Sequence, residues 1–133
     1  MSIRAMIETH PRMEGAANDA LIACIEACFN CAQTCISCAD ACLAEDMVAE
    51  LRQCIRLNED CADICLATGR AAIRRTGRNT EVLQKLVEAC TRACALCADE
   101  CGRHGEMHEH CRICGEACRV CENACRQALT QIQ

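Results

Sequence analysis

The stretch CIEACFNCAQTCISCADAC, residues 24–42, has a cysteine at every third or fourth position. The cysteines are separated alternately by four and three residues, a spacing that keeps side chains on one face of an α-helix and turned toward a partner helix. They are Cys24, Cys28, Cys31, Cys35, Cys38 and Cys42. This stretch predicts a helix whose buried face is made of thiols.

Similar spacing recurs in three later segments, and the four sets together account for all 18 cysteines of the chain. The later sets are Cys54, Cys61 and Cys65, then Cys90, Cys94, Cys97 and Cys101, and finally Cys111, Cys114, Cys118, Cys121 and Cys125. Helices joined by short loops run antiparallel to their neighbours in a bundle. Counted from the two expected loops around residues 44–46 and 102–106, the cysteines then lie at matching depths, so we expect thiols from several helices to share layers.

Composition favours an all-α fold, an antiparallel four-helix bundle with a short N-terminal helical segment. Phe29 is the only aromatic residue and 52% of the chain is hydrophobic, so the core must be built from small and aliphatic side chains, which suit close-packed helices. Capping and turn residues place the short helix before Pro11 and the long helices at about 18–44, 46–75, 79–101 and 107–129, with Asn18, Asp46 and Asn79 or Thr80 at their starts. With 133 residues, the chain is expected to form a single domain, residues 1–133.

An apolar stripe lies beside the thiols of the first long helix and is expected to hold the helices together. It consists of Ile22, Ile25, Phe29, Ala32, Ile36, Ala39 and Leu43. Toward one end of the bundle the cysteines give way to apolar residues that should close it, namely Ala17, Leu21, Ala72, Leu83, Val87, Ala128 and Ile132. The opposite end should carry His104, His108 and His110 with Met47 and Met107. Imidazole and thioether groups bind soft metal ions, although loop histidines are commonly only solvated and methionine commonly fills a core.

The net charge of −5 and the lack of a long basic stretch argue against a nucleic-acid partner. The first twenty residues hold no apolar run of the length that a signal peptide needs, and no later segment is expected to span a membrane. These features predict a cytosolic protein, in which thiols stay reduced. Bridging cysteines three or four apart on one helix would also distort it, so the thiols indicate a metal site more than a disulfide framework.

From the residues alone, three interpretations of a thiol-lined core stay open. Zn²⁺ requires four ligands for each ion, and a four-thiolate zinc site carries surplus negative charge into a dry core. Cu(I) is soft and monovalent, so one ion for each bridging thiolate leaves the core nearly neutral. A thiol redox enzyme usually has a C-x-x-C pair near a βαβ pattern, and no strand is expected here. Binding of Cu(I) is therefore preferred, with zinc or general metal buffering of a metallothionein-like kind and a redox enzyme as alternatives.

The C-x-x-x-C-x-x-C-x-x-x-C runs, the stretch CIEACFNCAQTCISCADAC and the closing HEHCRICGEACRVCENAC resemble the bacterial copper storage proteins, in the cytosolic branch that lacks an export signal. The resemblance covers about residues 5–128. It implies a four-helix bundle that stores many Cu(I) ions inside and assembles as a homotetramer. It also implies that His104, His108 and His110 lie at the mouth of the bundle and bind the last ions. We therefore expect storage of Cu(I) without catalysis, and a copper donor or acceptor protein as the partner.

Overall fold

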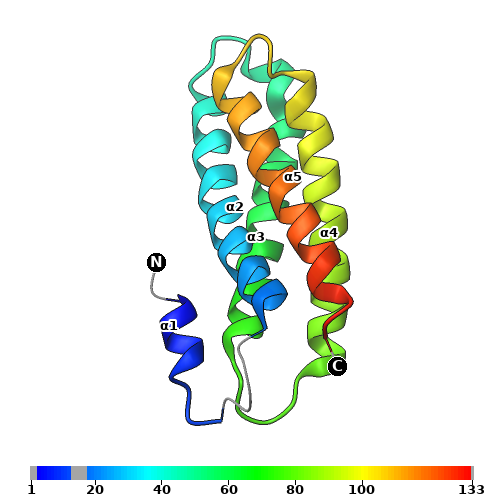
Figure 1. Cartoon of the computed structure of the whole chain (residues 1–133). Helices are drawn as coiled ribbons and strands as arrows, with labels where there is room; N and C mark the ends of the chain where they lie inside the picture. Colours follow the sequence, from blue (N-terminus) through cyan, green and yellow to red (C-terminus); the bar gives the residue numbers. More distant parts are fainter. Residues whose placement is uncertain (1–2, 13–17, 133) are drawn as a thin grey trace.

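The computed structural model describes residues 3–12 and 18–132, and every regular element in these ranges is a helix. The elements are α1 (Ile3–Glu8), α2 (Asp19–Leu43), the 3₁₀ helix η1 (Val48–Leu51), α3 (Arg52–Ile73), α4 (Thr80–Arg103) and α5 (Glu109–Leu129). Figure 1 shows the four long helices side by side and alternating in direction, with α1 beside the lower end of α2. The predicted antiparallel four-helix bundle with a short N-terminal helical segment is confirmed.

The start of α2 was predicted correctly, whereas the start of α3 was not. The side-chain oxygen of Asn18 accepts a hydrogen bond from the backbone N–H of Leu21 at 3.0 Å and so caps α2. Asp46 does not cap α3, because the chain first turns and then forms η1, and no side chain caps η1 or α3. This tight 3₁₀ segment ends at Leu51, whose side chain is fully buried in the core.

The ends of α4 and α5 lie close to their predicted positions. Helix α4 begins at Thr80, and the side chain of Asn79 before it donates a hydrogen bond to the carbonyl oxygen of Ala71 instead of capping the helix. This bond ties the α3–α4 loop to the end of α3. Helix α4 continues to Arg103 and α5 begins only at Glu109, so the loop between them lies two residues later than predicted.

Helices α2 and α3 approach closely where Phe29 lies over Gly69. A Cβ atom at Gly69 would lie 3.0 Å from two ring carbons of Phe29, closer than side chains normally come. Glycine thus allows the only aromatic ring of the chain to pack against the backbone of α3. This contact helps to fix how the two helices pair.

The apolar stripe of α2 is buried over only part of its length. Ile22 and Ile25 are fully buried, but Ile36 is 52% exposed and Leu43 is 59% exposed, so the prediction that the whole stripe holds the helices together was wrong for these two residues. Positions 22, 29, 36 and 43 are one heptad apart, and a straight α-helix rotates a strict heptad repeat by about 20° for each heptad. Exposure rises along this series from Ile22 through the half-buried Phe29 to Leu43, which is the effect expected of that rotation.

Helix α2 is long and apolar enough to cross a membrane by length and composition alone, contrary to the expectation that no segment approaches a membrane span. Half of its most apolar window, however, is buried inside the bundle. The cysteines that raise its mean hydropathy all face the interior. Its apolar character is therefore that of a core helix in a bundle.

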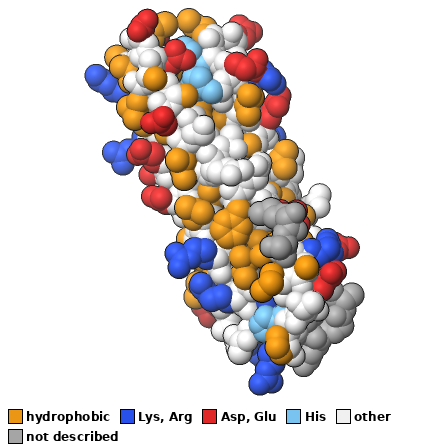
Figure 2. Space-filling view, turned by 90° about the vertical axis from the view of Figure 1, so that its left-hand side faces the viewer, with side chains coloured by type: hydrophobic (Ala, Val, Ile, Leu, Met, Phe, Trp, Pro, Cys, Tyr) orange, Lys and Arg blue, Asp and Glu red, His pale blue; other side chains and the backbone are white. Residues whose placement is uncertain are grey.

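The two ends of the bundle differ, as predicted. Buried apolar side chains close the lower end, where they come from Leu21, Ala72, Leu83, Val87 and Ala128, with Ile132 packed partly buried against them. Ala17, also predicted there, lies outside the described residues. The upper end is formed by the α2–η1 and α4–α5 loops, and Figure 2 shows a histidine surface near that end of the face carrying α2.

Candidate metal centre

All 18 cysteines are free thiols that point into the bundle. Cys38 is 2% exposed, and every other cysteine has no exposed surface. Each of the four long helices contributes thiols, because the alternating spacing keeps them on its inner face. The predicted thiol-lined interior is confirmed.

Thiols from different helices touch one another at the same depth. Near the lower end, the sulfur atoms of Cys24 and Cys125 lie 3.6 Å apart. In the middle, Cys61 and Cys94 are separated by 3.7 Å. Near the upper end, the sulfur atoms of Cys54 and Cys101 lie 3.6 Å apart. The matching depths counted from the loops therefore correspond to real layers of thiols.

The layers merge into a continuous thiol column. Sets of four sulfur atoms lie within 4.8 Å of one another, among them Cys28, Cys90, Cys121 and Cys125; Cys31, Cys65, Cys94 and Cys121; Cys31, Cys35, Cys61 and Cys118; Cys35, Cys97, Cys114 and Cys118; and Cys38, Cys42, Cys54 and Cys111. Four cysteines, Cys31, Cys35, Cys118 and Cys121, each belong to two of these sets. Four of the sets therefore overlap, and the fifth, at the upper end, is joined to them through Cys101, which lies 3.6 Å from Cys54 and 3.9 Å from Cys97.

Burial keeps the thiols of Cys42 and Cys111, at the upper end, protonated at neutral pH. Removal from water raises the pKa of Cys42 to about 11, and burial likewise raises the pKa of Cys111. A protonated thiol is nearly apolar and packs as a small hydrophobe, so the core needs no metal to be compact. A metal ion that binds such a thiol must displace its proton.

Among the described residues, Asn58 is the one side-chain amide inside the thiol column, and it is fully buried. Its side-chain oxygen accepts hydrogen bonds from the thiols of Cys97 at 3.1 Å, Cys114 at 3.2 Å and Cys101 at 3.5 Å. Its amide nitrogen donates to the sulfur of Cys54 at 3.7 Å. Asn58 occupies the position of α3 where the cysteine spacing is interrupted. Its hydrogen bonds hold together thiols of α3, α4 and α5.

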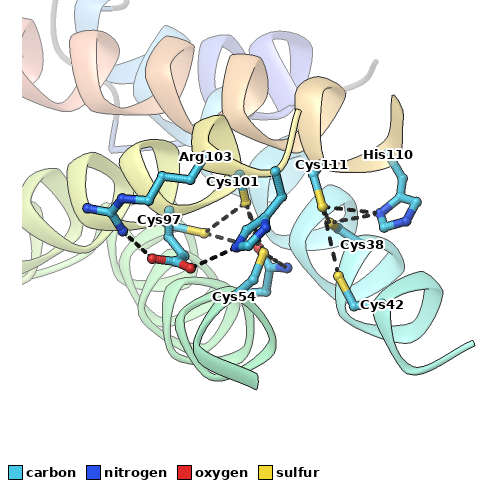
Figure 3. A network of polar contacts seen from close by, with 11 residues as sticks. Cys38, Cys42, Cys54, Cys97, Cys101, Arg103, His110 and Cys111 are labelled. Atoms are coloured by element: carbon cyan, nitrogen blue, oxygen red, sulfur yellow. Dashed lines mark hydrogen bonds and ion pairs between the residues drawn. The ribbon is translucent and has the colours of Figure 1, made fainter. Parts of the chain in front are cut away.

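His110 is the predicted histidine that reaches the thiols. Its Nδ1 atom lies 3.4 Å from the sulfur of Cys38 and 3.6 Å from that of Cys111, as Figure 3 shows. Its Nε2 atom lies 2.9 Å from a carboxylate oxygen of Glu45. A carboxylate only accepts hydrogen bonds, so in a neutral imidazole Nε2 carries the proton and Nδ1 presents its lone pair to the thiols.

The other two histidines are held by carboxylates at the same end of the bundle. Nδ1 of His108 lies 2.9 Å from the same oxygen of Glu45, and the rings of His108 and His110 stack with centroids 5.6 Å apart. Nε2 of His104 lies 3.0 Å from the nearly buried Glu100. The hydrogen bond from His110, together with the neighbouring His108, lowers the pKa of Glu45, and the bond from His110 has the largest effect. The end is thus a histidine cluster that is ordered by two carboxylates.

Met47 and Met107 lie on the surface of the same end, with 38% and 68% of their area exposed. Neither is packed in the core, so the interpretation of these methionines as core filler was wrong. Their role as metal ligands stays a prediction.

The donor set can be compared with what zinc and copper require. A tetrahedral zinc site with Zn–S bonds of about 2.3 Å has sulfur atoms about 3.8 Å apart, so a single set of four thiols here would also suit Zn²⁺. The sets share members such as Cys31 and Cys118, and four-thiolate zinc sites packed this closely would bring surplus negative charge into a dry core. Ligands that bridge two ions match this overlap, and soft thiolates favour Cu(I).

Two residues that shape the site were not recognised from the sequence. They are Asn58 and Glu45, and neither belongs to the cysteines and histidines from which the site was predicted. The signal for Asn58 was available, because a polar residue at a position where the pattern requires an inward-facing side chain must find buried partners. No local pattern connects Glu45 with histidines 63 and 65 residues later, since only the fold brings the two loops together.

The model of a protein family described as "Copper storage protein" matches residues 17–130. The structure of the copper storage protein from Streptomyces lividans loaded with 10 copper equivalents is 48% identical and has a TM-score of 0.92, covering 96% of this chain and 98% of that chain. A structure described as copper loading to a cytosolic copper storage protein from Streptomyces lividans, with five coppers, is 53% identical with a TM-score of 0.82, over 84% of this chain and 93% of that one. The Cu(I)-bound copper storage protein BsCsp3 is 36% identical with a TM-score of 0.70, over 81% of this chain and 96% of the other.

Proposed function

The chain belongs to the copper storage protein family, and from this premise we propose that its 18 cysteines bind Cu(I) ions along the whole thiol column. The function of the protein is storage of Cu(I). The observation that carries the assignment of ligands is the overlap of the thiol sets, in which one sulfur atom lies near two groups of partners. Each thiolate then bridges two ions, and each ion lies between thiolates.

Charge balance supports one ion for each thiolate. A Cu⁺ ion that replaces the proton of a thiol leaves the local charge unchanged, so a dry core can be filled without surplus charge. Four thiolates around one Zn²⁺ ion would instead leave two negative charges at each site. The core accordingly suits many monovalent ions and does not suit a few divalent ones.

The histidine cluster at the upper end forms the loading end in this proposal. His110 is the ligand among the three, because its Nδ1 atom already lies beside Cys38 and Cys111. The rings of His104 and His108 make their hydrogen bonds to the carboxylates of Glu100 and Glu45 instead of to thiols. Their part is to bind arriving ions transiently and pass them on to the thiols.

We further propose that the chain is a single domain, acts in the cytosol, has no catalytic activity and assembles as a homotetramer. The description of one Streptomyces lividans relative as cytosolic supports the location. The family is one of storage proteins and not of enzymes. A copper donor or acceptor protein is the expected partner, and the acidic net charge of −5 does not suit nucleic acid.

Anaerobic titration of the reduced protein with Cu(I), followed by metal and thiol analysis of the isolated complex, tests the proposal. We expect saturation at roughly one Cu(I) for each cysteine, with one or two further ions at the histidines. Addition of Zn²⁺ to the loaded protein should not displace copper. Saturation at about four or five ions would indicate discrete tetrahedral sites and would refute the bridged column.

A further inference from the structure

A hollow of about 400 Å³ lies on the side of the bundle between α2 and α5, near the upper end. We call it the side groove. It is lined by Gln33, Thr34, Ser37 and Cys38 of α2 and by His110 and Ile113 of α5. The side groove therefore joins the solvent to the point where Cys38 meets His110.

Cys38 is the one thiol that solvent touches. It is 2% exposed, whereas Cys42 and Cys111, which lie nearest the upper end, have no exposed surface. The side groove is lined by Cys38 together with His110 of the histidine cluster, so it connects that cluster with the one sulfur atom that is exposed.

The size and the walls of the side groove define what it can bind. Pockets for small molecules have about 300–1,000 Å³, so this one is at the small end of the range and far too small for a folded protein domain. Its walls provide one side-chain amide and two hydroxyl groups, and no Lys, Arg, Asp or Glu lines it. A small, polar molecule without a large net charge fits these walls. A ligand that exchanges Cu(I) with a thiol must itself carry a soft donor atom.

We infer that the side groove is a docking site for a small, polar thiol that delivers Cu(I) to Cys38 or removes it. The inference rests on the proposed storage function and deepens it by naming the chemical class of the carrier. In the delivery step the carrier's Cu–S bond breaks, a new Cu–S bond forms to Cys38, and the proton of the Cys38 thiol moves to the carrier's sulfur. Copper stays Cu(I), so no oxidant or reductant is needed, and removal is the same exchange in reverse.

His110 completes the site. Its Nδ1 atom lies 3.4 Å from the sulfur of Cys38, so it can hold the ion while one sulfur leaves and the other arrives. The ion then passes from Cys38 to Cys111, whose sulfur lies 3.9 Å away. Cys54 belongs to the same set of four sulfur atoms as Cys38, and its sulfur leads down the column to that of Cys101 at 3.6 Å.

The test is a stopped-flow measurement of anaerobic copper transfer from the Cu(I)–glutathione complex to the reduced protein. Ser37→Phe fills the groove without removing a metal ligand. Ala23→Phe, at an exposed position of the same helix well below the groove, is the matched control. We expect the Ser37→Phe variant to load about tenfold more slowly, because exchange at a thiol depends on access to it, while its final capacity and the rate of the control stay at wild-type values.

Equal loading rates for the Ser37→Phe variant and wild type would overturn the docking site and would show that copper enters elsewhere. A low final capacity in all three proteins would instead refute the storage proposal, so the two failures are distinguishable.

A second measurement does not depend on copper or on that variant. Brief treatment of the apo-protein with iodoacetamide, followed by peptide mass spectrometry, should modify Cys38 before any other cysteine. First modification of Cys42 or Cys111 would place the access route at the end of the bundle and contradict the inference.

Discussion

The raised thiol pKa values predict that the metal-free protein loses stability in mildly alkaline solution. Burial raises the pKa of Cys42 from its ordinary value of 9.0 to about 11. A thiol with a higher pKa in the folded state than in the unfolded chain stabilises the fold fully below pH 9, and this contribution is lost as the pH rises through the folded value. One pKa unit corresponds to 1.36 kcal/mol, so Cys42 alone should account for a loss of about 2 to 3 kcal/mol between pH 9 and pH 11.

The assay is urea unfolding of reduced protein under argon, followed by circular dichroism at intervals from about pH 8 to about pH 11. Cys111, whose pKa is also raised by burial, should add to the loss. In a Cys42→Ala variant the fall in the free energy of unfolding should be smaller by about 2 to 3 kcal/mol. The copper-loaded protein should show no such fall, because its thiolates carry no proton to lose. A free energy of unfolding that stays constant across this range in the apo-protein would refute the assignment of protonated thiols to the folded core.

Five substitutions test three other parts of the structure. Asn58→Leu keeps the number and branching of the side-chain heavy atoms but removes the acceptor of three weakly donating thiols. The free energy of unfolding of the apo-protein should therefore change by less than about 1.5 kcal/mol, and a larger loss in urea unfolding would mean that these bonds are strong. Leu83→Ala should leave a cavity at the closed end and so lower the free energy of unfolding by about 2–5 kcal/mol without changing the copper capacity. A reduced capacity on titration would show that this end holds metal. His110→Ala should lower capacity by about one ion, whereas His104→Ala and His108→Ala should slow loading only, and equal effects of all three on capacity would contradict the different roles.

The cysteine pattern predicted the fold well because it states, residue by residue, which face of each helix is buried. The same reasoning failed for Ile36 and Leu43, since spacing alone does not include the rotation of a heptad repeat around a straight helix. It also failed at Asp46, where an eligible cap residue lies before a tight 3₁₀ segment and not before the helix itself. These errors concern surface positions and loops, where the same residues are compatible with several local structures.

The parts of the site that follow from the residue spacing within each helix could be predicted from the sequence. The thiol layers follow from matching depths in antiparallel helices, and they were predicted. The contact of His110 with Cys38 depends on how α5 lies against α2, and the bonds of Glu45 to two histidines depend on how two loops meet. Such relations are set by the packing of the whole bundle and leave no mark on the spacing within any one segment.

The thiol column is continuous from Cys42 to Cys24 in steps of no more than 4.8 Å, with Cys101 as the link between its upper set and the rest. It is closed at the lower end by Leu83 and Val87, and it meets the solvent at Cys38 alone. A store of this shape exchanges its ions through one opening. An ion bound near Cys24 can leave only by moving from thiol to thiol along the column, whereas an ion near Cys38 is already beside the solvent. Release from the full store should therefore be fast at first and slower as the deeper ions follow.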